Sequence, residues 1–85
     1  MQSFTYTIQE ELGIHARPAG FLMKEARKYS SHIVLHANGK SADVKKLIAL
    51  MQMAVKKGAE VTITAEGEDE VQAVTGLKAF FQATL

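Results

Sequence analysis

An Asn38-Gly39 dipeptide near the middle of the chain is the sequence feature that most restricts its fold. Asn-Gly favours a two-residue turn between antiparallel strands, because both residues tolerate the positive φ angles of that turn. The β-branched segment 32–37 before the dipeptide and the short segment 40–43 after it are therefore expected to pair as a hairpin. The hairpin predicts a largely antiparallel sheet.

Two further strands are indicated by alternation of apolar and polar residues. One begins near Phe4 at the start of the chain, and the other covers residues 60–65. In the second, the apolar residues would share one side of the sheet, and Thr62 and Thr64 would share the other.

Three segments have helical spacing. The first covers residues 16–29, and the second covers 45–55, with Gly58 expected as its stop signal. A capping box of Asp69 and Gln72 is expected to open the third helix. The stripe that this helix is expected to bury comprises Val71, Val74, Leu77 and Phe81. The order strand, helix, strand, strand, helix, strand, helix predicts an α+β domain with its helices on one face of the sheet.

Length and composition narrow the possible classes of protein. Eighty-five residues are enough for a single domain over 1–85 but not for a second core. The chain has no cysteine, which suits a reducing cytoplasm and leaves no thiol chemistry. A net charge of +1 argues against a nucleic-acid partner. The start of the chain does not resemble a signal peptide, and no segment has the length needed for membrane insertion.

His15 is the strongest candidate for a functional residue. It lies between the first predicted strand and the first predicted helix, followed by Arg17 and by Pro18 in the first helical turn. The start of a helix offers unpaired N–H groups, here those of Ala16 and Arg17, and a dipole that favours negative charge. Arg17 adds a guanidinium suited to phosphate oxygens. A neutral imidazole beside such an anion site predicts a transient phosphohistidine, and hence a phosphoryl carrier.

The second predicted helix has more apolar residues than one buried face can use. They divide into two stripes, Leu50, Met53 and Ala54 on one side and Leu47, Ile48 and Met51 on the other. One stripe is expected to stay exposed as a docking surface for a protein partner. The first helix is expected to extend this surface through the outward residues Gly20, Phe21 and Lys24.

Other candidate sites are weaker. His32 and His36 have no third metal ligand near them in sequence, so we expect a solvated sheet face and neither a metal site nor a cofactor. The acidic run 66–70 is expected to cap the last helix. An RNA-binding domain would need a basic stripe with exposed aromatic residues, which is missing.

The chain resembles the HPr family, the histidine phosphocarriers of the bacterial phosphoenolpyruvate-dependent sugar phosphotransferase system. The similarity extends over essentially all 85 residues. It rests on the Asn38-Gly39 hairpin, on the Ala65-Glu66-Gly67 turn and on the signature Gly13-Ile14-His15-Ala16-Arg17-Pro18-Ala19. The resemblance implies an open-faced β-sandwich of βαββαβα order, with strand order 1-4-2-3 and three helices on one face.

The resemblance also implies a function. His15 would accept a phosphoryl group on Nδ1 from enzyme I and pass it to a sugar-specific EIIA component, while Arg17 steadies the phosphate. The chain would be a monomeric carrier without turnover of its own, rather than an enzyme. The partners would contact Gly20, Phe21, Lys24, Leu47, Ile48 and Met51.

Two positions depart from the family pattern. Lys46 stands where many relatives carry a regulatory serine, which argues against control by a serine kinase at this position. Leu12 stands where relatives often carry a small polar residue near the phosphate. These departures leave open an alternative, an HPr-like paralogue that acts as a non-catalytic regulatory binding module. The intact His15 and Arg17 argue against that alternative, because a pure binder needs no nucleophile.

Overall fold

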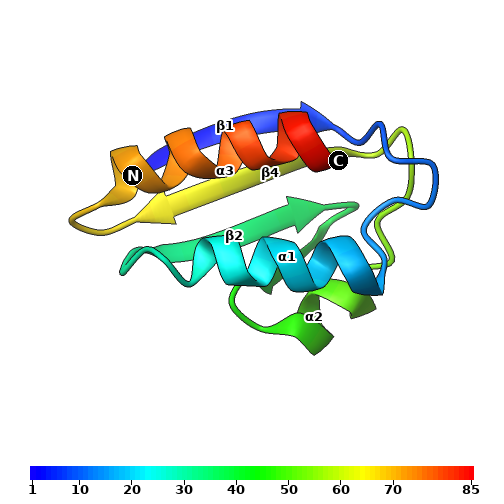
Figure 1. Ribbon diagram of the computed structural model, residues 1–85, viewed down its shortest axis with the longest axis horizontal. Helices are drawn as coiled ribbons and strands as arrows, with labels where there is room; N and C mark the ends of the chain where they lie inside the picture. Colours follow the sequence, from blue (N-terminus) through cyan, green and yellow to red (C-terminus); the bar gives the residue numbers. More distant parts are fainter.

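In the computed structural model, which describes residues 1–85, three helices cover one face of a four-stranded antiparallel sheet (Figure 1). The strands are β1 (Gln2–Thr7), β2 (His32–Ala37), β3 (Lys40–Asp43) and β4 (Glu60–Glu66). The helices are α1 (Ala16–Ala26), α2 (Leu47–Gln52) and α3 (Glu70–Thr84). The strand order is β1-β4-β2-β3. The predicted α+β class, βαββαβα order and sheet order are confirmed.

The central hairpin forms as predicted. Asn38 and Gly39 have φ angles of 54° and 74°, the left-handed values that a tight turn between antiparallel strands requires. The register pairs Ala37 with Lys40 and continues to Val34 opposite Asp43. No helix is long and apolar enough to cross a membrane.

The core lies between the sheet and the helices. Val61, Ile63 and Ala65 of β4 are fully buried, whereas the intervening threonines are partly exposed. Opposite them, Phe81 of α3 is fully buried and packs edge-to-face against Phe4 and Tyr6, with ring centroids 5.6 and 5.5 Å apart. Full burial of a large apolar side chain such as Val61, Ile63 or Phe81 contributes about 1.5–3 kcal/mol. The alternation predicted for β4 is therefore confirmed.

The predicted length of the second helix was wrong. α2 ends at Gln52, and Ala54 adopts a left-handed φ of 52°. After this bend the chain contacts the loop before α1. There the carbonyl of Val55 accepts a hydrogen bond from Ile14 N–H at 2.9 Å. Gly58 consequently lies beyond the helix, and its N–H donates to the carbonyl of Ile8 at 2.9 Å. A long-range contact, rather than a glycine stop, ends this helix.

Two smaller predictions about helices were also wrong. α1 ends at Ala26 instead of near residue 29, and the guanidinium of Arg27 donates to the carbonyl of Lys45 at 2.9 Å. In α3, Val71 is 59% exposed, while Ala73 is fully buried in its place. Ala73 thus joins Leu77 and Phe81 in the buried cluster between the helices and the sheet.

Candidate functional site

His15 occupies the N-cap position of α1. Its backbone is extended, with φ −101° and ψ −173°, and its carbonyl accepts the first bond of the helix from Ala19 N–H at 2.9 Å. The imidazole makes no capping hydrogen bond and is only half-buried. Both ring nitrogens are therefore available to a ligand or a partner.

Two backbone donors next to His15 have no acceptor. The N–H groups of Ala16 and Arg17 take part in no hydrogen bond within the chain, and Pro18 has no N–H to donate. Unpaired donors at a helix N-terminus carry a positive partial charge and bind anions. The structure thus leaves free the two backbone groups that the sequence predicted as phosphate ligands.

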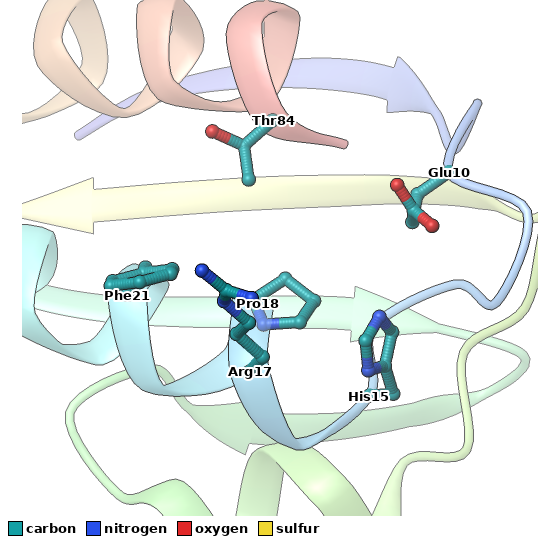
Figure 2. Close-up of a pocket in the computed structure, with 6 residues that line it drawn as sticks. All are labelled: Glu10, His15, Arg17, Pro18, Phe21 and Thr84. Atoms are coloured by element: carbon teal, nitrogen blue, oxygen red, sulfur yellow. The ribbon is translucent and has the colours of Figure 1, made fainter.

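A shallow pocket of about 170 Å³ surrounds the ring. It is lined by Glu10, His15, Arg17, Pro18, Phe21 and Thr84 (Figure 2). The Cζ atom of Arg17 lies 5.8 Å from the centroid of the Phe21 ring, a cation–π arrangement worth about 0.5–1 kcal/mol at an exposed position. Arg17 is thereby held beside the pocket without a carboxylate partner. Its charge remains available to an incoming anion.

The loop before His15 is anchored by a close backbone approach. Gly13 has a φ of 70°, and a β carbon at this position would lie 2.2 Å from the carbonyl oxygen of Val55. Only glycine fits both conditions. The next residue, Ile14, is buried and donates its N–H to that same carbonyl at 2.9 Å. This contact between the loop and the segment after α2 determines where α1, and therefore His15, begins.

Exposed apolar residues lie on α1 and α2, and one of them, Phe21, lines the pocket. Phe21, Ile48 and Met51 are 46%, 65% and 40% exposed, whereas Leu50 on the opposite side of α2 is buried. We call the predicted partner-binding set the docking face; it comprises Gly20, Phe21, Lys24, Leu47, Ile48 and Met51. Within it, Lys24 is also exposed, and Gly20 and Leu47 are half-buried. The predicted division of the second helix into a buried and an exposed stripe is confirmed with two exceptions. Leu47 of the exposed stripe is half-buried against the core, and Ala54 of the buried stripe is exposed beyond the end of the helix.

Several other residues singled out in the sequence lie outside the pocket. Leu12 is 68% exposed and does not line it, and Lys46 is the exposed N-cap residue of α2. His32 and His36 are exposed on the open face of the sheet, as predicted, and His36 Nε2 lies 3.3 Å from the hydroxyl of Thr64.

The acidic run before α3 lies at the other end of the molecule from the start of α1 (Figure 1). Asp69 forms no capping bond with its own helix, so the predicted capping box was wrong. Its carboxylate instead accepts hydrogen bonds from the Ser31 hydroxyl and from the N–H groups of Ser30 and Ser31, at 2.8 and 3.0 Å for the two N–H groups. These bonds, led by that of the hydroxyl, lower the pKa of Asp69.

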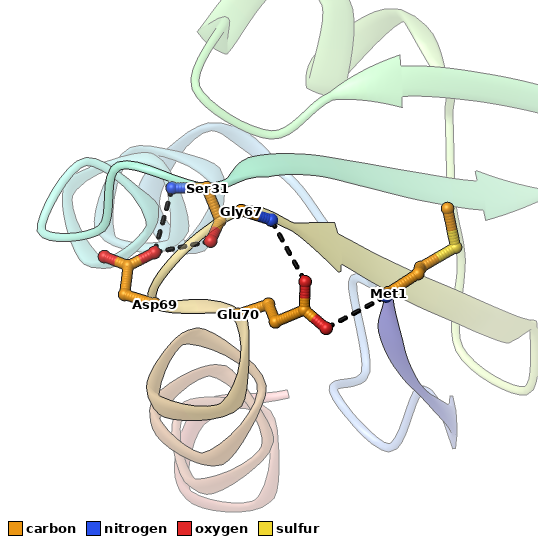
Figure 3. Close-up of polar contacts among 5 residues, drawn as sticks. All are labelled: Met1, Ser31, Gly67, Asp69 and Glu70. Atoms are coloured by element: carbon orange, nitrogen blue, oxygen red, sulfur yellow. Dashed lines mark hydrogen bonds and ion pairs between the residues drawn. The ribbon is translucent and has the colours of Figure 1, made fainter.

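Glu70 makes the neighbouring connection. Its carboxylate pairs with the Met1 ammonium at 2.9 Å and accepts from Gly67 N–H at 3.1 Å (Figure 3). These contacts, led by that with the Met1 ammonium, lower the pKa of Glu70. The acidic run therefore connects the start of α3 to the residues that precede β1 and β2.

Sequence reasoning missed two residues of the pocket, Glu10 and Thr84. They reach it because the backbone N–H groups of Gln9 and Glu10 both donate to the carbonyl of Leu85, at 2.5 and 2.8 Å. This contact joins segments that lie at opposite ends of the chain. No local pattern in the sequence indicates it.

Comparison with known proteins agrees with this geometry. The sequence model of the family described as "PTS HPr component phosphorylation site" matches residues 2–83. The phosphocarrier protein HPr of Mycoplasma capricolum is 45% identical over 78 residues, which are 92% of this chain and 88% of that protein.

Solved structures give the same result. The histidine-containing phosphocarrier protein of a Mycoplasma superposes with a TM-score of 0.95 at 42% identity, covering 98% of this chain and 94% of that one. An HPr from Thermoanaerobacter tengcongensis superposes with a TM-score of 0.93 at 32% identity, covering 98% and 93%.

Proposed function

The chain belongs to the HPr family, the phosphocarriers of the phosphotransferase system, and on that premise we propose that His15 is its phosphoryl acceptor. His15 Nδ1 takes the phosphoryl group from a phosphohistidine of enzyme I and passes it to a histidine of an EIIA component. In each transfer one P–N bond breaks and one forms, and no group of this chain other than His15 is covalently changed. The carrier acts in the cytoplasm as a monomer and turns over no small molecule.

One observation carries this proposal. The half-exposed imidazole of His15 shares its pocket with Arg17 and is followed directly in the chain by the two unpaired backbone N–H groups of Ala16 and Arg17. The N–H groups of Ala16 and Arg17 receive phosphate oxygens, and the guanidinium of Arg17 moves from Phe21 to a third oxygen. Each interaction at the helix end contributes about 0.3–1 kcal/mol. Such moderate stabilisation allows the group to leave again.

The docking face would bring the partner histidine to His15. It combines exposed apolar side chains of both helices with Lys24, and such a surface suits partners that must bind and dissociate in turn. Lys46 places a fixed positive charge at the start of α2, where a phosphoserine would instead add negative charge. We therefore propose that transfer in this chain is not controlled by a serine kinase at position 46.

Incubation with phosphoenolpyruvate and enzyme I tests the acceptor. The wild-type chain should gain one acid-labile phosphoryl group per molecule, and His15→Ala should gain none while it unfolds at nearly the wild-type temperature. His32→Ala and His36→Ala are matched controls, because both histidines are exposed on the open face of the sheet. A His15→Ala protein that is labelled like these controls would refute the assignment.

A further inference from the structure

Glu10 is the only acidic side chain in the pocket around His15 (Figure 2). The other lining groups are cationic, apolar or hydroxyl-bearing, and all of these suit an anion. In Figure 2 the carboxylate of Glu10 lies across the pocket from the ring of His15 and from Arg17, on the loop that leads into α1. A negative charge in a pocket built for a phosphoryl group requires an explanation.

The position of Glu10 is determined by the fold. Its N–H donates to the carbonyl of Leu85 at 2.8 Å, and its own carbonyl accepts from Gly13 N–H at 2.9 Å. The residue is half-buried, and its carboxylate forms no ion pair with any lysine or arginine of the chain. The one bond to this carboxylate is a long one, from Leu12 N–H at 3.5 Å. The charge of Glu10 is therefore held at the pocket without being neutralised.

A phosphoryl group on His15 would bring a charge of about −1.5 to −2 into this pocket. The N–H groups of Ala16 and Arg17 and the guanidinium would attract it, while the Glu10 carboxylate would repel it. The repulsion is present only in the phosphorylated state, so it raises the free energy of that state alone. Interactions of this kind shift an equilibrium without changing the fold.

We propose that Glu10 sets the phosphoryl-transfer potential of the carrier by destabilising the phosphohistidine. The inference rests on the proposed function of His15. The attractive groups make the pocket able to receive the phosphoryl group, and Glu10 prevents it from becoming a sink. No bond to Glu10 forms or breaks, and the phosphoryl group moves only between ring nitrogens.

The test measures how a phosphoryl group divides between two forms of the chain. Isotope-labelled wild-type chain is mixed with an equal amount of Glu10→Gln. A catalytic amount of enzyme I, with less phosphoenolpyruvate than the total amount of chain, then equilibrates the phosphoryl group between the two forms. Mass spectrometry then gives the phosphorylated fraction of each. We expect Glu10→Gln to hold the group about tenfold more strongly at low ionic strength, an advantage that shrinks as salt is added.

Two variants control for other effects. Glu11→Gln makes the same charge change at the next residue, which pairs with Lys57 at 2.9 Å and does not line the pocket; it should divide the group equally with the wild type. Glu10→Asp keeps the charge and should stay within about twofold of the wild type.

The results separate the two proposals. Equal division between wild type and Glu10→Gln, or a Glu10→Asp shift as large as that of Glu10→Gln, would overturn the role of the Glu10 charge. In either case the wild-type chain would still be labelled at His15, so the proposed carrier function would stand. A wild-type chain that takes no phosphoryl group would overturn both.

Discussion

The close approach at Gly13 predicts that alanine will be far more harmful there than at another glycine of similar backbone conformation. Gly13 and Gly39 have φ angles of 70° and 74°, so an added β carbon is strained to the same degree at both. That strain costs about 1–2 kcal/mol. At Gly39 nothing lies within 4 Å of the new carbon, whereas at Gly13 it would lie 2.2 Å from Val55 O and 2.6 Å from Lys56 Cα.

The additional cost at Gly13 follows from this clash. The two backbone segments must separate by roughly 1 Å to restore normal contact distances. Overpacking of this kind costs about 1–3 kcal/mol, and loss of the Ile14–Val55 hydrogen bond costs about 1 kcal/mol more. Gly13→Ala should therefore lower the free energy of unfolding by roughly 3–6 kcal/mol, against about 1–2 kcal/mol for Gly39→Ala.

Thermal unfolding followed by circular dichroism measures this difference. For a domain of this size, 1 kcal/mol corresponds to about 4–8 °C in Tm. Gly13→Ala should therefore unfold at least ~10 °C below Gly39→Ala. Gly58→Ala is a second control, with a φ of 88° and no atom within 4 Å of the new carbon. If all three variants lost the same stability, the close approach of the loop to Val55 would be refuted.

Two further predictions concern the acidic run and the docking face. The pKa of Asp69 is lower in the folded chain than its ordinary value of 3.8. The ionised carboxylate therefore stabilises the fold at pH values above 3.8. This stabilisation is lost as the pH falls through the pKa of the folded state. Asp69→Asn should therefore have a lower Tm than the wild type at neutral pH, but should lose less stability than the wild type when the pH falls below about 4. If Tm fell with pH in the same way for both proteins, the bonds to Ser30 and Ser31 would be contradicted. Ile48→Glu changes a residue that is 65% exposed, so it should leave Tm within a few degrees of the wild type but slow phosphorylation by enzyme I about tenfold or more. Stopped-flow or quenched-flow labelling measures the rate, with Val71→Glu, exposed on α3, as the control; equal rates for the two variants would exclude Ile48 from the docking face.

The features that the sequence predicted correctly all depend on neighbours in the chain. The φ preferences of Asn38 and Gly39 produce the hairpin, and the two-residue alternation of β4 determines which side chains reach the core. His15 is placed at the start of α1 by the extended residues before it and by Pro18 in the first turn. The apolar excess of α2 likewise indicated an exposed stripe, because a short helix can bury only one of its faces.

The predictions that failed concern contacts between distant segments. α2 is short because residues 53–55 must reach the loop at Gly13, and Asp69 bonds Ser30 and Ser31 in place of its own helix. Glu10 and Thr84 enter the pocket only because Leu85 binds the loop that carries Glu10.

The amino-acid sequence by itself determined the order of the elements, the sheet hairpin and the place of His15 before its helix-end donors, since each follows from preferences within a few residues. Only the tertiary structure decided which other side chains face His15. A negative charge acts on a phosphoryl group through space, and its distance from His15 depends on how the two ends of the chain pack together.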